Sequence, residues 1–543
     1  MNNSKLFEKY LLNNNVSVSN RLVIAPITLF ASNVDGSISE EERQYLQNRA
    51  KGIGIYILGS TAISPEGISS IVQPRAFSDK DLPSLSERAN IIKKQGSLAI
   101  AQLNHRGALA KQDLGLSPVA PSAEIAKKIV EERGLPLIDM HELTDNEIIK
   151  IINKFAYATE LAIKAGYDGI ELHGANNYLI QQFFSPYTNR RNDDWGGSDK
   201  KRMNFPIQIV DAVCKVREKY NRPDFIIGYR LSPEEPYEEG ITMTDTLKLV
   251  RALSAKPIQY IHISQAKYFQ KVRRGDGEGQ ERLKVIHNET KGKVALIGVG
   301  GLLSESDFNL AINSGFSEFI AVGRASMINK NLGSLLAEGK GDNINLTLDP
   351  QQPEKYSIPS TLWKMCISGQ EWLPPLEEKT HKYFKKKFNE GQESTVNPSF
   401  YEKTVNYQGK NVHLKFWDTA GQEQFNAIST IYYQNSVGAL LVYDVTIFET
   451  FKKVESWVNT LQEVVGKDIT FVIAGNKFDL SDKNSLSQNS SAIDQYCTKE
   501  HCLHFYTSAK TGYNLEEAFE SLTNSVLKKV YTSTGDAANK RKG

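Results

Sequence analysis

The stretch VALIGVGG (residues 294–301) is an apolar run that ends in glycines, and EFIAVGR (318–324) repeats this pattern one helical length later. Six similar runs precede them: RLVIAPITL (21–29), IYILGSTA (55–62), SLAIAQLNH (97–105), DGIELHG (168–174), DFIIGYRLS (224–232) and IQYIHIS (258–264). Continuous apolar strands that alternate with helical patterns indicate a parallel sheet covered by helices. Eight such units over about 300 residues predict a closed (β/α)₈ barrel, with an open doubly wound sheet as the structural alternative.

The overall composition is that of a soluble globular protein. Apolar residues make up 40% of the 543 residues, charged residues make up 24%, and the net charge is +2. This charge gives no electrostatic reason to expect a nucleic-acid partner. The N-terminus lacks a long apolar core, and no run approaches the roughly 20 apolar residues of a membrane helix. We expect a cytoplasmic protein without a membrane anchor.

Four cysteines, Cys214, Cys366, Cys497 and Cys502, are scattered along the chain and form no C-x-x-C pair. This spacing argues against a disulfide framework, a zinc ribbon and an iron–sulfur cluster. We therefore expect no metal site.

The pattern changes after the barrel domain, which we place at residues 1–375. A junction follows at 376–390, and its basic stretch HKYFKKKF (381–388) is better explained as a solvated helix face than as a nucleic-acid patch. A hairpin and three strand–helix units then predict a second α/β domain at 391–532: SFYEKTVNY (399–407), GKNVHLKFWDTAG (409–421), VGALLVYDV (437–445), TFVIAGNKFD (470–479) and HCLHFYTSAK (501–510). The polar tail at 533–543 is expected to be disordered.

Polar residues at the end of the fourth apolar run form the first candidate site. His173, Asn176 and Tyr178 follow one another closely in the stretch HGANNY. A neutral histidine and an asparagine amide can both donate to one substrate oxygen, and a phenol nearby can supply a proton. A helix N-terminus with polar caps is the alternative explanation of the same spacing.

The last two runs carry a candidate phosphate site. Gly300, Gly301 and Gly323 would let backbone N–H groups approach a phosphate, and Arg324 would add a charge-assisted contact. Phosphate sites recur at this place in barrels of this class.

In these motifs, residues 1 to about 375 resemble the old yellow enzyme family of FMN-dependent NADH:flavin oxidoreductases and ene-reductases. The matching pieces run in family order: NRLVIAPIT (20–28), AQLNHRG (101–107), HGANNYLIQQFFSP (173–186), NRR (189–191), WGGS (195–198), GYRLSP (228–233), GVGG (298–301) and AVGR (321–324). The resemblance implies that Thr28 hydrogen-bonds the flavin O4, that Pro26, Ser60 and Gln102 border the ring, and that Arg230 faces N1 and O2. It also implies that Gly300, Gly301, Gly323 and Arg324 hold the phosphate, that His173 and Asn176 bind the substrate oxygen, and that Tyr178 donates the proton.

The implied activity is a ping-pong reduction of an enone or a similar small activated alkene, with FMN as cofactor and NADH or NADPH as reductant. The chain resembles the short, flavin-only branch of the family, and a homo-oligomer formed through the barrel is compatible with it. Asn177 stands where glycine is common, which is a departure from the pattern.

From about residue 384 the chain resembles Ras-superfamily GTPases, most closely the Rab branch. The pieces are FNEGQESTVNPSF (388–400), KFWDTAGQEQF (415–425), LLVYDVT (440–446), AGNKFDL (474–480) and TSAK (507–510). The resemblance assigns Thr395 to the first switch, and Asp418, Gly421 and Gln422 to Mg²⁺, γ-phosphate and water. Guanine would be read by Asn476, Lys477 and Asp479, supported by Ser508, Ala509 and Lys510.

The phosphate-binding loop of such a GTPase is missing from the sequence. That loop reads G-x-x-x-x-G-K-[ST], and nowhere in the chain does Ser or Thr follow Gly-Lys. EKT (378–380) stands in its place, and the strand that should precede the loop is missing as well. We therefore expect weak or no GTP binding and no useful hydrolysis. No cysteine follows Cys502, so a prenyl anchor is not expected, and binding of Rab effectors is doubtful.

Three readings of the whole chain remain open. The first is an FMN oxidoreductase that carries a degenerate GTPase-like fragment, and a fusion of unrelated sequences would fit the abrupt junction. The second is a GTP-binding or effector-binding module with the barrel as passenger. The third is a flavin-binding barrel without turnover, because of Asn177.

Overall fold

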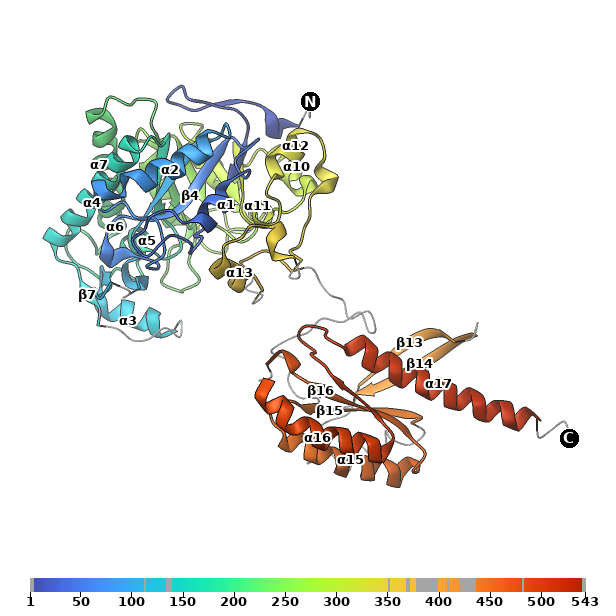
Figure 1. The fold of residues 1–543 in the computed structure, drawn as a ribbon. Coiled ribbons are helices and arrows are strands. Elements are labelled where there is room, and N and C mark those ends of the chain that lie inside the picture. Colours follow the sequence, from blue (N-terminus) through green and yellow to red (C-terminus); the bar gives the residue numbers. More distant parts are fainter. Residues whose placement is uncertain are drawn as a thin grey trace. The chain divides into compact units, whose positions relative to one another are not determined.

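The computed structural model describes residues 4–111, 114–132, 139–349, 352–367, 372–376, 399–407, 410–418, 436–480 and 483–539. Two compact units, 1–377 and 378–543, divide the chain (Figure 1). Within the described part, no helix combines the length and the apolar character needed to cross a bilayer.

Eight parallel strands form the closed barrel of the first unit. In sequence they are β3 (Leu22–Ile24), β4 (Ile55–Ala62), β5 (Leu98–Asn104), β8 (Gly169–Gly174), β9 (Ile226–Leu231), β10 (Tyr260–Ile263), β11 (Ala295–Val299) and β12 (Phe319–Val322). Each strand pairs with the next, and the last strand returns to the first through Ile320 opposite Leu22. The predicted barrel is confirmed, and the alternative of an open sheet is wrong.

Helices surround the barrel (Figure 1). The longer ones are α2 (Leu82–Lys93), α4 (Asp145–Lys164), α7 (Asn204–Lys219), α8 (Met243–Ser254), α9 (Arg282–Thr290) and α10 (Glu305–Asn313). The shorter ones are α1 (Glu40–Leu46), α5 (Leu179–Phe184), α6 (Asp199–Arg202), α11 (Arg324–Ile328), α12 (Leu332–Ala337) and α13 (Ser360–Ile367). At the start of α8, Thr242 and Asp245 form a reciprocal capping box, which satisfies backbone donors that the first turn would leave open.

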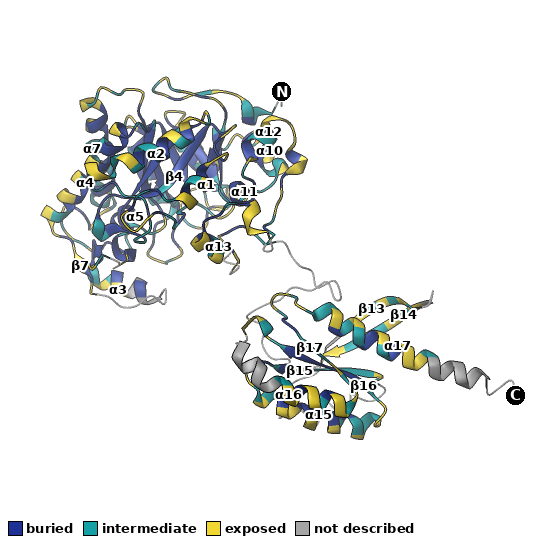
Figure 2. Ribbon diagram, viewed as in Figure 1, coloured by how far each residue is buried: buried dark blue, intermediate teal, exposed yellow. Residues whose placement is uncertain are grey.

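Alternate strand residues divide between two cores. Residues such as Ile55, Ile100 and Ile226 point into the barrel, whereas their neighbours pack against the helices. The small hairpin β1 (Tyr10–Leu11) and β2 (Ser17–Val18) contributes Val18 to the inner core. Most barrel residues are buried (Figure 2). Strand β8 differs from these apolar positions, because Glu171 and His173 occupy alternate positions on it.

An excursion separates β5 from β8. It contains β6 (Val119–Ala120), α3 (Ala123–Glu132) and β7 (His141–Glu142), and β6 pairs with β7. Ala126 and Val130 of α3 join a small apolar cluster against which Tyr178 packs. The excursion therefore supplies an apolar neighbour to the carboxyl end of the barrel.

The second unit holds two separate sheets. Strands β13 (Ser399–Tyr407) and β14 (Lys410–Asp418) form the predicted hairpin, and β15 (Gly438–Asp444), β16 (Thr470–Asn476) and β17 (Leu503–Tyr506) form a parallel sheet. The helices are α15 (Glu449–Val465), α16 (Lys483–Glu500) and α17 (Leu515–Asn539). Among the described residues, no strand joins the two sheets.

The expected disorder of the tail from residue 533 is wrong for residues 533–539, which continue α17. Once a helix exists, each added residue gains one backbone hydrogen bond, and Ala537 and Ala538 are strong helix formers. Residues 540–543 lie outside the described residues, as does the basic stretch 381–388.

We expect the second unit to lose stability in acid, because His504 is partly buried and must become charged. Its Nε2 lies 3.1 Å from the Tyr443 hydroxyl, and burial lowers the pKa of His504 to about 4. An unfolded histidine titrates near about 6.5, so the unfolded chain takes up the proton first as the pH falls. The stability that neutral His504 contributes is therefore fully present above about pH 6.5. It is lost as the pH falls from about 6.5 to about 4, and the loss is at most about 3 kcal/mol.

Hydrogen exchange of the β16 amides at pH 7 and pH 4.5 measures this loss in the full chain. His504→Gln should flatten the dependence on pH. If the β16 amides of His504→Gln lose as much protection from exchange at pH 4.5 as those of the wild-type protein, another group causes the acid sensitivity.

Candidate active site

The carboxyl ends of the barrel strands bring the predicted flavin-site residues to one mouth. In the strand register, Gln102 lies beside Glu171, and His173 lies beside Arg230, which in turn lies beside His262. All five side chains are buried. A polar layer on β5, β8, β9 and β10 thus replaces the apolar filling found deeper in the barrel.

Glu171 holds two members of this layer. Its carboxylate accepts a hydrogen bond from Gln102 Nε2 at 2.8 Å and another from His262 Nδ1 at 2.9 Å. Burial works against its charge, but His262 and Arg230 keep the pKa of Glu171 below its ordinary value. Burial also lowers the pKa of His262. An ionised carboxylate can only accept, so His262 donates to it from Nδ1.

Several buried polar atoms at the mouth are available to a ligand. Within the described part of the chain, His173 Nδ1, Arg230 Nε and His262 Nε2 have no hydrogen-bond partner. Such orphans are rare in native proteins and call for an explanation. Arg230 supplies donors and Gln102 supplies an amide oxygen, which match the acceptors and the N–H of a flavin pyrimidine edge, so the residues present fit FMN.

His173 is suited to donate without carrying charge. Burial, and then the Arg230 guanidinium, hold the pKa of His173 well below its usual value. Its ring meets the Tyr178 ring edge to face, with centroids 4.8 Å apart. The Arg106 guanidinium lies 5.0 Å from the Tyr178 ring centroid. The structure therefore brings the expected donor and the expected acid together.

The turn between His173 and Tyr178 is built on two asparagines. Asn176 and Asn177 both have φ of 60°, a left-handed conformation that asparagine tolerates better than most residues. Ser264 Oγ donates to Asn176 Oδ1 at 3.0 Å, and Arg230 Nη2 donates to Ser264 Oγ at 3.1 Å. Ser264 thus contacts the amide oxygen of Asn176 and not its Nδ2 group. Asn177 takes the left-handed conformation that glycine would supply, so it keeps the turn.

On the other side of the mouth, Thr28 Oγ1 and Ser60 Oγ lie 3.5 Å apart, and Asn104 Nδ2 lies 3.5 Å from Ser60 Oγ. Pro26 lies close to the strand β4 backbone, since a Cβ at Gly59 would come within 2.5 Å of Pro26 Cβ. The segment after β3 thus brings Pro26 and Thr28 next to β4 and its Ser60, as predicted, and Asn104 of β5 joins them.

The expected phosphate residues also meet. Gly300 has φ of 132°, and a Cβ there would lie 2.7 Å from the Lys267 carbonyl carbon, so only glycine fits. A Cβ at Gly301 would lie 3.9 Å from Arg324 Nη2, and Gly323 immediately precedes α11. The glycine turn after β11 and the arginine after β12 therefore face one another.

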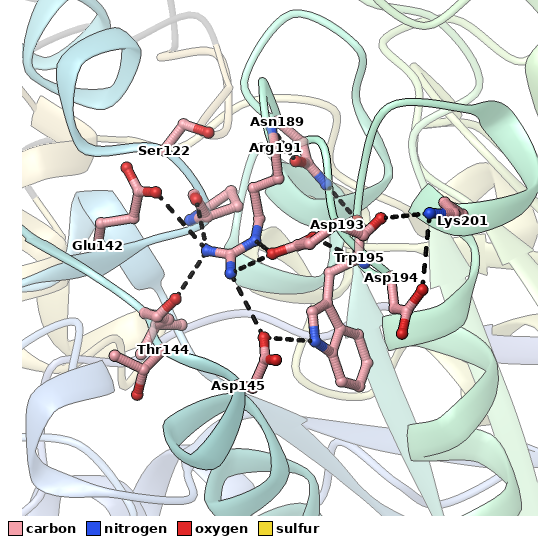
Figure 3. A network of polar contacts seen from close by, with 12 residues as sticks. Ser122, Glu142, Thr144, Asp145, Asn189, Arg191, Asp193, Asp194, Trp195 and Lys201 are labelled. Atoms are coloured by element: carbon pink, nitrogen blue, oxygen red, sulfur yellow. Dashed lines mark hydrogen bonds and ion pairs between the residues drawn. The ribbon is translucent and has the colours of Figure 1, made fainter.

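A partly buried arginine, Arg191, ties the loops beside the mouth together (Figure 3). Arg191 donates to the Leu143 carbonyl at 2.7 Å and pairs with Asp193 at 2.6 Å. Trp195 Nε1 donates to Asp145 at 3.1 Å. The loop after α5, which carries the NRR and WGGS motifs, is thus pinned to the β6–β7 excursion and to the start of α4.

In the second unit, the expected guanine-binding residues are assembled. Asn476 Oδ1 accepts from Ala509 N at 2.8 Å, and Ser508 Oγ donates to Asp479 at 2.5 Å. Lys477 pairs with Asp444 at 2.6 Å. Lys510 follows directly on the same loop, whereas Asp418 ends β14 in the other sheet. Thr395, Gly421 and Gln422 lie outside the described residues.

The sequence motifs did not predict three residues of the mouth, namely Glu171, His262 and Asn104. Each lies two positions from a predicted residue or strand-end residue on the same strand: His173, Ser264 and Gln102. The period of two in a strand was the signal that could have found them. In the described residues no group of three or more metal-ligating side chains occurs.

Comparison with known proteins covers both units. The family model described as the NADH:flavin oxidoreductase / NADH oxidase family matches residues 5–343, and the Ras family model matches residues 379–528. The first unit is 38% identical over 369 residues to the probable NADH-dependent flavin oxidoreductase YqiG of Bacillus subtilis, a match that covers 68% of this chain and 97% of that protein.

Two further matches show the range of relatives. The chain is 35% identical over 370 residues to the NADH:fumarate oxidoreductase of Klebsiella pneumoniae, covering 67% of this chain but only 39% of that longer protein. The solved structure of morphinone reductase in complex with tetrahydroNAD aligns with a TM-score of 0.55 at 23% identity, over 66% of this chain and 97% of that one. This last likeness concerns the fold.

Proposed function

Because the chain belongs to the NADH:flavin oxidoreductase / NADH oxidase family, we propose that its barrel binds FMN in the mouth and reduces activated alkenes such as enones with NADH or NADPH. The observation that carries the proposal is the convergence of His173, Asn176 and Tyr178 beside Gln102 and Arg230, with buried polar atoms of His173 and Arg230 left for a ligand. When bound, the flavin supplies hydride transfer between the nicotinamide and the alkene.

The chain's own residues would orient and polarise the reactants. Gln102 and Arg230 would hold the pyrimidine edge of the ring, Thr28 and Ser60 would border it, and the turn at Gly300 and Gly301 with Arg324 would hold the phosphate. His173 and the Asn176 amide would donate to the substrate oxygen and draw electrons from the alkene. Tyr178 would give a proton to the carbon next to the polarised group.

Purified protein tests this proposal directly. The preparation should be yellow or take up added FMN, should bleach under anaerobic conditions with NADH or NADPH, and should regain its colour when cyclohexenone is added. Protein that stays colourless with added FMN would contradict the proposed cofactor, and reduced protein that is not reoxidised by any enone would contradict the substrate class.

We further propose that the second unit does not hydrolyse GTP. The base-reading residues are assembled around Asn476 and Asp479, but the sequence offers no phosphate-binding loop and no Mg²⁺-binding Ser or Thr after Gly-Lys. Phosphate contacts carry most of the affinity in such sites, so the base contacts alone should bind weakly.

Titration with a fluorescent GTP analogue should therefore give at most weak binding that does not depend on Mg²⁺, and no phosphate release above the buffer rate. An intact small GTPase in the same buffer serves as the positive control. Mg²⁺-dependent binding in the micromolar range or tighter would overturn the proposal.

A further inference from the structure

Glu171 is a fully buried carboxylate in the barrel that the proposed reaction does not use. It lies two residues before His173 on β8, so both side chains point into the barrel. Its exposed fraction is 0%, and the exposed fractions of its partners Gln102 and His262 are 2% and 0%. A buried ion of this kind is costly unless it is fully hydrogen-bonded, so its presence at the mouth calls for a role.

The contacts of Glu171 orient one expected flavin ligand. Because an ionised carboxylate only accepts hydrogen bonds, Gln102 must turn its Nε2 toward Glu171, as it does at 2.8 Å. The Gln102 carbonyl oxygen is then directed away from Glu171. His262 donates to the other carboxylate oxygen at 2.9 Å, which fixes the carboxylate from the far side.

The negative charge of Glu171 also lies near the positive charge of Arg230. Arg230 stands beside His173 in the register and is close enough to Glu171 to lower the pKa of the carboxyl group. The polar layer contains one carboxylate, that of Glu171, and one guanidinium, that of Arg230, and both are buried. The field at the mouth is therefore the difference between two nearby charges in a medium that screens them little.

We propose that Glu171 is a positioning residue that fixes the Gln102 amide and offsets the charge of Arg230, and thereby sets the reduction potential of the bound flavin. The inference rests on the proposed function. Reduction adds negative charge to the flavin ring, which Arg230 stabilises and Glu171 opposes. Removing the Glu171 charge leaves Arg230 unopposed and should favour the reduced flavin.

The test compares Glu171→Gln with wild-type protein. Glutamine has the same shape, can still accept from Gln102, and can donate to His262 once that ring changes tautomer, so charge is the main loss. The ratio of affinities for reduced and oxidised FMN should rise about tenfold, which is about 30 mV toward positive potential for a two-electron couple. The visible spectrum of the bound flavin should shift as well.

Glu318→Gln is the matched control. Glu318 is a carboxylate that also pairs with a histidine, with His287 Nε2 at 2.8 Å, but it immediately precedes β12 at the amino end of the barrel. Its substitution should leave the ratio within threefold of wild type. A ratio for Glu171→Gln that is unchanged within threefold, or that falls, would overturn the proposal.

Glu171→Asp tests the same proposal if Glu171→Gln does not fold. Aspartate keeps the charge but is one methylene shorter, so FMN should bind more weakly at an unchanged ratio of affinities. A tenfold rise of the ratio in this variant would overturn the proposal. A wrong proposed function would be recognised in the wild-type protein, which would then not bind FMN or would stay oxidised with NADH and NADPH. A wrong role for Glu171 would be recognised only in the variants.

Discussion

Replacing Tyr178 by phenylalanine should slow enone reduction by about a hundredfold to ten-thousandfold, because a positioned general acid contributes about that much. Reduction of the flavin by NADH or NADPH needs no proton from this phenol and should stay within about twofold of wild type. The hydroxyl is the only group lost, and the ring contacts to His173 and Arg106 remain.

Anaerobic stopped-flow spectroscopy separates the two half-reactions through the absorbance of the oxidised flavin. Tyr157→Phe is the control, since Tyr157 is an exposed tyrosine on the outer helix α4 and should change neither rate. If Tyr178→Phe reoxidises with the enone at the wild-type rate, the proton comes from another group or from solvent.

Replacing Glu42 by alanine should cost the barrel about 3–5 kcal/mol of stability, because it leaves a buried guanidinium without its carboxylate. Arg88 donates to Glu42 from Nε at 2.6 Å and from Nη2 at 2.8 Å, and the two side chains are 1% and 4% exposed. Arg88 also donates to Ser32 Oγ at 3.1 Å, so the pair joins α1, α2 and the loop after β3. Both charges are shielded from water.

Chemical unfolding followed by the release of FMN fluorescence measures the loss in the barrel. The double substitution Glu42→Leu and Arg88→Leu should recover most of the stability, because no charge is then left unpaired. Glu289→Ala is the surface control; it removes the partner of the exposed Arg251 and should cost less than about 1 kcal/mol. A loss of that small size for Glu42→Ala would show that Arg88 finds water or another partner.

Much of the fold and of the mouth was predictable because the information is local. Each strand is visible in the sequence as an apolar run, and Gln102, His173 and Arg230 lie within two residues of the carboxyl ends of their strands. The missing G-x-x-x-x-G-K-[ST] motif of the second domain can also be read directly from the sequence, and the missing first strand stays a prediction. The helical extension of α17 to Asn539 was missed because weak polar propensities do not show where a helix already under way will stop.

The Glu171 network was not predictable in the same way. The period of two could have placed Glu171 and His262 on the inward faces of their strands, but they are 91 positions apart and no local pattern shows that they meet. Their contact depends on β8 and β10 flanking β9 in the right register, and that follows from the pairing of the whole sheet.

The sequence by itself determined the order of strand–helix units, the residues that end each strand, and the absence of a phosphate-binding loop in the second domain, because these are properties of neighbouring residues. Only the tertiary structure decided that the sheet closes, through Ile320 opposite Leu22, and that one buried carboxylate joins Gln102 to His262. Backbone pairing of distant strands and burial of charge are settled by the whole chain, since each requires partners that no local segment contains.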